Sequence, residues 1–133
     1  MLLQIGGNDI LQKNNLDVVR SELTELYKEA KKRSETVVMI SSGNVGTASA
    51  FSGTKKAGEY ERITRQFRQM FIEVAEASDV TFVDLFKEPE DDVFLREPKI
   101  YLAIDGLHPS ATGYAYWYKT LAPQLEKVLK EGN

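Results

Sequence analysis

The feature that most constrains this chain is a regular alternation of short apolar runs with longer stretches of helical periodicity. The apolar runs occupy residues 1–5, 36–40 and 80–85. Apolar residues recur every three or four positions over 16–33, over 59–77, and again after Pro109. That spacing is typical of amphipathic helices, whereas short, continuously apolar runs are typical of buried strands. The order strand–helix, repeated three times, favours an α/β layer fold with a parallel sheet and right-handed crossovers.

The segments between these elements differ in composition. Residues 41–58 are rich in Ser, Gly and Thr and are predicted to be a loop, and 87–98 are acidic, contain prolines and are predicted to be a surface loop. Proline is favoured in the first turn of a helix, so Pro109 is predicted to begin the last helix, with Ser110 serving its start. A length of 133 residues fits a single domain over 1–133.

Composition excludes several classes of function. The net charge of −3 leaves no basic stripe for nucleic acid. There are no cysteines and one histidine, so thiolate and zinc sites are not expected, and neither is a cofactor. No apolar run is long enough to span a membrane, and no signal peptide is visible, so the default expectation is the cytoplasm.

The only histidine lies in the segment Asp105-Gly106-Leu107-His108-Pro109. A serine esterase needs a base near neutral pH and a carboxylate that orients it and stabilises the imidazolium. An aspartate three residues before a histidine supplies both if the backbone turns tightly between them, and Gly106 permits such a turn. A surface turn followed by a helix cap is the structural alternative.

A second polar segment, Gly6-Gly7-Asn8-Asp9, directly follows the first apolar run. Parallel-sheet enzymes place their sites at the carboxyl ends of strands. Glycines allow the backbone to approach a substrate closely, and the side chain of Asn8 can donate to an oxyanion. The structural alternative is an Asn-Asp turn after a strand.

Together, these segments resemble two of the sequence blocks of the SGNH (GDSL-type) esterase/lipase hydrolases. The order His-Pro-Ser-x-x-Gly-Tyr, common in that family, also occurs at 108–114. The resemblance implies a carboxylic ester hydrolase for acyl or aryl esters, lipids or acetylated sugars. It implies His108 as base, Asp105 as the acid that orients it, and Asn8 with Gly7 at the oxyanion and substrate site.

The chain departs from the family pattern because it contains no Gly-Asp-Ser nucleophile block. The resemblance implies a flavodoxin-like sheet, of which this chain is expected to keep about three strands and to lack the N-terminal ones. We therefore expect weak or no activity for the chain as it stands, with Ser41 or Ser42 as the internal alternative nucleophiles. A non-catalytic, oligomerising remnant or ligand-binding protein of the same fold is the alternative function. An exposed strand at 1–5 would pair with another chain, which predicts a homo-oligomer.

Two further groups of side chains have structural interpretations. The aromatic residues Tyr114, Tyr116, Trp117 and Tyr118 are expected to pack on the sheet, with a sugar-stacking platform as the alternative. The acidic residues Glu88, Glu90, Asp91 and Asp92 lack the glycine and spacing of a calcium loop and are expected to be solvated.

Overall fold

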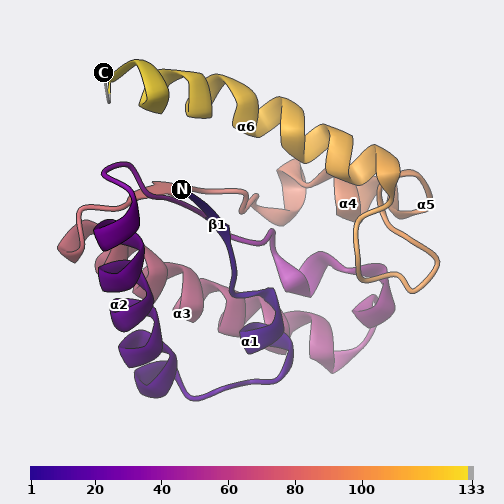
Figure 1. The fold of residues 1–133 in the computed structure, drawn as a ribbon. Helices are drawn as coiled ribbons and strands as arrows, with labels where there is room; N and C mark the ends of the chain where they lie inside the picture. The colour runs from indigo at the N-terminus through magenta and orange to yellow at the C-terminus, as the bar shows by residue number, and fades with distance from the viewer. Residues whose placement is uncertain (132–133) are drawn as a thin grey trace.

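The computed structural model describes residues 1–131, which form a three-stranded parallel sheet with helices on both faces (Figure 1). The strands are β1 (Leu2–Gln4), β2 (Val38–Ile40) and β3 (Thr81–Val83), in the order β1-β2-β3. Leu3 lies opposite Met39, which lies opposite Phe82. The predicted α/β fold with a parallel sheet is confirmed. Each strand is shorter than its apolar run because the ladder joins only three residues of each.

Six α-helices flank or follow the sheet within the described residues. Their bounds are α1 (Gly7–Leu11), α2 (Leu16–Arg33), α3 (Lys55–Ala77), α4 (Val93–Arg96), α5 (Pro98–Tyr101) and α6 (Ala111–Glu131). Three single 3-10 turns complete them: η1 (Val45–Thr47), η2 (Ser49–Phe51) and η3 (Pro89–Asp91). None of the helices in residues 1–131 is both long and apolar enough to cross a membrane.

Helix α2 has the predicted bounds because its first turn is capped. The side-chain oxygen of Asn15 accepts hydrogen bonds from the backbone nitrogens of Asp17 and Val18, which would otherwise lack helical partners. The buried face of α2 consists of Val19, Leu23, Tyr27 and Ala30. Leu26, an apolar residue that also lies in α2, is exposed. Helix α3 begins at Lys55, four residues before the predicted start, so the predicted loop 41–58 ends earlier.

The two faces of the sheet carry separate apolar cores. One core lies between the sheet and helices α2 and α3, and contains Met39, Tyr27, Phe67 and Phe71. The other core lies between the sheet and α6, and contains Val38, Ile40, Val83 and Leu85 with Trp117, Leu121, Leu125 and Val128. Figure 1 shows α6 on one side of the strands and α2 and α3 on the other. Since β2 is covered on both faces, all three of its residues are buried, as the apolar run predicted.

The start of α6 corrects one prediction and confirms another. Pro109 does not begin the helix: it lies two residues before Ala111 and forms an isolated bridge with Leu102. Ser110 serves the helix start, because its Oγ accepts a hydrogen bond of 3.1 Å from the backbone nitrogen of Gly113.

The aromatic residues of α6 divide between core and surface. Trp117 packs on the sheet, as predicted, and Tyr116 packs edge-on against Phe94 and Tyr101. Tyr114 and Tyr118 are exposed, which contradicts their predicted packing on the sheet.

The predicted surface loop 87–98 is more ordered than its composition indicates. It contains η3 and α4, and Pro98 begins α5. Asp92 is only 4% exposed, so its predicted solvation is wrong. Its Oδ1 accepts a hydrogen bond from the backbone nitrogen of Phe94 at the start of α4. A buried carboxylate needs such partners, and capping a helix supplies one.

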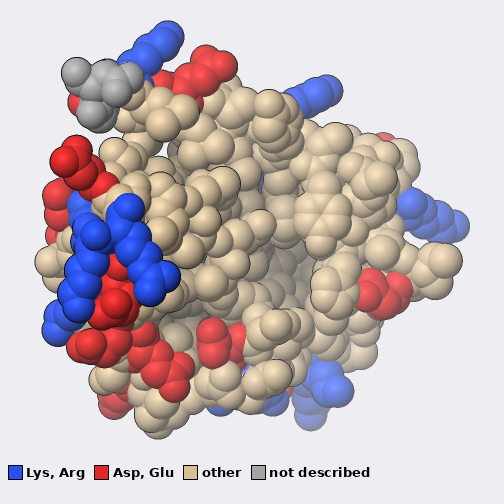
Figure 2. All heavy atoms as spheres, in the orientation of Figure 1, with Lys and Arg blue, Asp and Glu red and all other residues tan. Residues whose placement is uncertain are grey.

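Strand β1 forms one edge of the three-stranded sheet. The Leu3 side chain packs with the α2–α3 core, whereas Leu2, which alternation points to the opposite face, is 54% exposed. Helix α6 covers the residues of β2 and β3 on that face but not Leu2. Figure 2 shows that charged side chains gather toward the rim of this view and leave its centre largely uncharged.

Candidate functional site

The three strands are parallel, so the segments that follow them emerge at the same edge of the sheet. Gly6 follows β1, Ser41 follows β2, and Asp84 follows β3. Both sequence blocks singled out above lie in segments that leave this edge or return toward it. The geometry of each block decides what it can do chemically.

The first block is built by a close approach between Gly6 and helix α3. Gly6 has a φ of 110°, and a Cβ added there would lie 2.5 Å from Cζ of Phe71. Only glycine fits, because the backbone is left-handed and the aromatic ring occupies the side-chain position. This turn starts α1 and places Asn8, which is exposed, in its first turn. Oδ1 of Asp9 accepts a hydrogen bond of 2.8 Å from Nδ2 of Asn14.

The second block holds a histidine and a carboxylate in contact. Nδ1 of His108 lies 2.5 Å from Oδ2 of Asp105. The other oxygen, Oδ1, accepts hydrogen bonds from the backbone nitrogens of Leu107 and His108, at 2.9 and 3.0 Å. The aspartate thus closes an Asx turn with one oxygen and orients the imidazole with the other. The His108 side chain is 62% exposed.

These hydrogen bonds keep the carboxylate ionised. The hydrogen bond with His108, followed by those from the two backbone nitrogens, lowers the pKa of Asp105 to about 2. Donors to the charged form of a carboxylate stabilise it relative to the neutral acid. At neutral pH, Asp105 is therefore an anion that can hold one tautomer of the imidazole and stabilise the imidazolium.

The turn that carries this pair rests on η2. Gly106 has a φ of 68°, and a Cβ at this residue would lie 2.7 Å from Oγ of Ser49. The backbone oxygen of Gly106 accepts a hydrogen bond of 3.0 Å from the nitrogen of Ala50. Glycine is needed here both for the left-handed backbone and for the close contact with the preceding turn. The long segment after β2 therefore positions the histidine.

Ser42 lies close to Gly7 of the first block and lines the same cavity as the neighbours of His108 in the second block. A Cβ added to Gly7 would lie 3.7 Å from Cβ of Ser42. Ser42 also lines a cavity together with Leu107 and Pro109, the residues on either side of His108. No hydrogen bond joins Asn8 to Asp105 or His108 within residues 1–131.

The two candidate serines after β2 have different surroundings. Ser41 is buried, and its Oγ accepts a hydrogen bond of 3.2 Å from the backbone nitrogen of Leu85, which makes it a structural residue. Ser42 is half-buried and lies at the cavity. The geometry therefore distinguishes two serines that were equivalent in the sequence.

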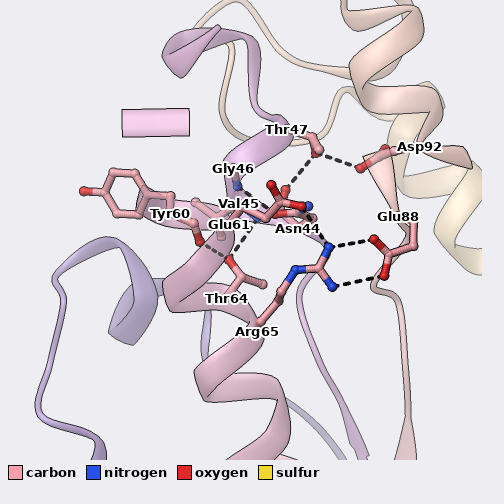
Figure 3. A network of polar contacts seen from close by, with 10 residues as sticks. All are labelled: Asn44, Val45, Gly46, Thr47, Tyr60, Glu61, Thr64, Arg65, Glu88 and Asp92. Carbon is pink, nitrogen blue, oxygen red and sulfur yellow. Dashed lines mark hydrogen bonds and ion pairs between the residues drawn. The ribbon is translucent and has the colours of Figure 1, made fainter. Parts of the chain in front are cut away.

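Three polar residues beside this cavity were not identified from the sequence as a group. Thr47 Oγ1 lies 2.8 Å from the backbone oxygen of Asn44 and 2.7 Å from Oδ2 of Asp92 (Figure 3). Asn44, Thr47 and Asp92 are all buried. Thr47 and Asp92 are 45 residues apart along the chain, so only the fold brings them together. The order Asn-x-Gly at 44–46, typical of a side chain that bonds its own backbone, was the one available signal.

Arginines from α3 fix the segment that follows β3. Arg65 reaches both Glu61 on its own helix and Glu88, with its Nη2 lying 2.6 Å from Oε2 of Glu88 (Figure 3). Arg68 pairs with Asp84, the residue after β3. These contacts hold the chain that leads to η3 and Asp92. No group of three or more acidic or histidine side chains in the described part of the chain could hold a metal ion.

The fold assigns the chain to the α/β proteins with a parallel sheet, and its site segments follow the carboxyl ends of the strands. Within that class, residues 1–116 match the GDSL-like Lipase/Acylhydrolase family. The match covers most of the chain, and the chain belongs to this family, as the two sequence blocks predicted. A search of curated proteins finds no match.

Proposed function

We propose that this chain carries the base, its orienting acid and an oxyanion donor of a GDSL-type carboxylic ester hydrolase. Family membership supports ester or acyl hydrolysis in general. The observation that carries the assignment of roles is the 2.5 Å contact between His108 Nδ1 and Asp105 Oδ2. With Nδ1 held by the carboxylate, Nε2 of His108 is left to accept the proton of an attacking hydroxyl group and to return it to the leaving alcohol.

Asn8 and Gly7 are the proposed oxyanion and substrate residues. Gly7 lies at the start of α1 and has no side chain, so a substrate can approach its backbone N–H closely. The exposed Asn8 can donate its amide to the same oxygen. The substrates are small acyl or aryl esters, lipids or acetylated sugars, hydrolysed without a cofactor.

The sequence of this chain does not contain the nucleophile block of the family. The chain contains no Gly-Asp-Ser, so the catalytic proposal expects its hydrolysis of esters to be slow but faster than the buffer rate. Removing one member of a catalytic triad costs several powers of ten in rate. If a serine within the chain replaces the nucleophile, the half-buried Ser42 is the candidate, because Ser41 is buried and bound to Leu85.

Two measurements test the proposal. The first is labelling with a fluorophosphonate, which reacts with an activated serine. The second is hydrolysis of ethyl acetate, followed by acid release, because a free imidazole cleaves activated phenyl esters without any serine. Labelling at Ser42 that is lost in both Ser42→Ala and His108→Ala would support an internal nucleophile, with Ser52→Ala, at an exposed serine, as the matched control.

A non-catalytic protein of the same fold is the second candidate function. It is favoured by the absent Gly-Asp-Ser and by the 62% exposure of the His108 side chain, which shows no serine hydroxyl bonded to it in residues 1–131. No labelling, together with ethyl acetate hydrolysis at the buffer rate, would support this candidate and overturn the catalytic one for the chain as it stands.

We also propose that two copies of the chain associate through β1. The open edge of a strand presents unpaired N–H and C=O groups, and charged side chains that discourage pairing are absent from 1–5. Leu2 is exposed beside this edge, and the centre of this face of the molecule is largely uncharged (Figure 2). Sedimentation velocity over a wide concentration range tests the association, and a monomer throughout would refute it.

A further inference from the structure

A cavity of about 80 Å³ lies between the segment after β2, the turn before His108 and helix α6. Its polar lining includes Asn44, Thr47 and Asp92, and its apolar lining includes Phe94, Leu107 and Trp117. A water molecule occupies about 30 Å³ of liquid, so the cavity holds a group the size of two or three waters. Leu107 and Pro109, the neighbours of His108 along the chain, also line the cavity, whereas His108 itself does not.

The amide of Asn44 has a donor that nothing in the described residues satisfies. Asn44 is 6% exposed, and its Nδ2 is buried without a hydrogen-bond partner. Its Oδ1 accepts a hydrogen bond of 2.9 Å from the backbone nitrogen of Gly46, which fixes the oxygen and nitrogen positions of the amide. A buried, unpaired N–H group costs free energy, which an acceptor brought beside it would recover.

The carboxylate of Asp92 supplies the complementary acceptor. Its Oδ1 receives the backbone nitrogen of Phe94, and its Oδ2 lies 2.7 Å from Oγ1 of Thr47. An ionised carboxylate has about four lone-pair positions, so it can accept a further hydrogen bond. Thr47 Oγ1 also lies 2.8 Å from the backbone oxygen of Asn44, so the Thr47 hydroxyl lies between Asn44 and Asp92.

We propose that this cavity binds a hydroxyl group on the alcohol half of an ester substrate, with Asn44 as the donor to that hydroxyl and Asp92 as its acceptor. This inference rests on the ester hydrolase function proposed above and narrows its substrates to esters of diols, polyols or sugars. Asn44 and Asp92 determine specificity and take no part in proton transfer. The attached carbon atoms contact Phe94 and Trp117.

The chemistry of the lining selects this group over others. A hydroxyl is the small neutral group that both donates and accepts, so it satisfies Asn44 and Asp92 together. A carboxylate only accepts hydrogen bonds, so it would give no donor to the Asp92 oxygens. A methyl group would leave the Asn44 donor unpaired, and a site built to bond a hydroxyl rejects the analogue that lacks it.

Binding can be measured without turnover because Trp117 is the only tryptophan in the chain and lines the cavity. We would titrate the protein with 2-hydroxyethyl acetate and with ethyl acetate, and follow the tryptophan fluorescence. Tighter binding of the hydroxylated ester, by roughly 2- to 10-fold for each net hydrogen bond, is the expected result. Equal affinity for the two esters would overturn the proposal and leave a water-filled cavity.

Paired substitutions test the roles of the two residues. Asn44→Asp keeps the oxygen that receives the Gly46 nitrogen but replaces the donor by an acceptor, and Asp92→Asn does the reverse. Each alone is expected to abolish the preference for 2-hydroxyethyl acetate. The double variant restores one donor and one acceptor and is expected to regain it. A double variant that folds but shows no preference would contradict the donor–acceptor assignment.

The matched control is Asn15→Asp, which makes the same chemical change at the cap of α2, away from the cavity. It is expected to keep the wild-type preference. Circular dichroism verifies folding, and if N44D does not fold, D92N and the double variant still decide the result. Failure of the proposed hydrolase function would show as absent turnover of both esters, whereas failure of this inference would show as equal binding.

Discussion

Asp105 is held on both carboxylate oxygens by residues that follow it within one turn, and His108 provides two of the three contacts, one from its ring and one from its backbone. The ring contact lowers the pKa of Asp105 most. In His108→Ala the pKa is expected to rise from about 2 toward its ordinary value of 3.8, and to stop short because the backbone contacts remain. A carbon-13 carboxyl titration measures this shift, and an unchanged pKa would contradict the geometry.

The same contact makes a prediction for acid stability. Because the pKa of Asp105 is lower in the folded protein, the stabilisation is present above pH 3.8 and is lost as the pH falls toward 2. The difference in unfolding midpoint between the wild type and Asp105→Asn is therefore expected to shrink between pH 4 and pH 2. A difference that stays constant over that interval would show that the ionised carboxylate is not the source.

Gly106→Ala is expected to displace the turn that carries Asp105 and His108. The added Cβ would lie 2.7 Å from Ser49 Oγ and 3.0 Å from the nitrogen of Ala50. Gly53→Ala is the matched control, because Gly53 also has a positive φ, 75°, but no atom within 4 Å of such a Cβ. Both variants place an alanine at a positive φ, so the backbone strain is matched between them. Because only the Cβ at residue 106 meets other atoms, only Gly106→Ala is expected to change the His108 ring resonances in NMR spectra. Equal changes in both would refute the contact.

Gly46→Ala is expected to destabilise the protein by roughly 1–3 kcal/mol, the usual cost of overpacking. Its Cβ would lie 2.5 Å from the backbone oxygen of Ala57 and 2.6 Å from the nitrogen of Glu61, where η1 approaches α3. Gly58→Ala, within α3 and with no atom near the added carbon, is expected to stabilise by about 0.5–1 kcal/mol. Urea unfolding of the two variants should therefore give changes of opposite sign.

The buried Tyr27 is expected to make the stability of the folded protein depend on pH in the alkaline range. Its side chain is completely buried, and burial raises its pKa above the ordinary value of 10.0. Below pH 10 the phenol is neutral in both states, whereas above it the unfolded chain ionises more readily, so stability is lost as the pH rises. Tyr27→Phe is expected to lose less stability than the wild type between pH 9 and pH 11. Parallel curves in thermal unfolding would contradict this.

The association proposed for β1 predicts a specific effect of charge. Leu2→Lys places a cation beside the open edge and is expected to shift the sedimentation coefficient toward that of a monomer. Val18→Lys is the matched control, since Val18 is an apolar residue of similar exposure, 55%, on helix α2. Loss of association in both variants would indicate a general effect of charge.

The alternation of apolar runs with stretches of helical periodicity was sufficient to predict the class of fold and the order of its main elements. It predicted the three strands with bounds that were too long, and helix α2 to the residue, because continuous apolar runs and helical spacing reflect burial directly. It missed α1, α4 and α5, which have only four or five residues each. Helices this short have no recognisable period, and contacts with the rest of the molecule stabilise them. Asp92 is the clearest difference from the prediction. It belongs to an acidic run with the composition of a surface loop, yet its side chain is buried.

The sequence by itself determined that this is a GDSL-family α/β chain with a histidine and an aspartate close enough along the backbone to bond. Their contact is local, because the two residues are three positions apart and Gly106 lies between them, so sequence spacing was enough. Only the tertiary structure decided that Ser41 is structural, that Ser42 lies between Gly7 and a cavity, and that Asn44 and Asp92 both line that cavity. Those relationships join segments tens of residues apart. Packing of η1 and η2 against α3 and the His108 turn sets them, and no local pattern of residues encodes that packing.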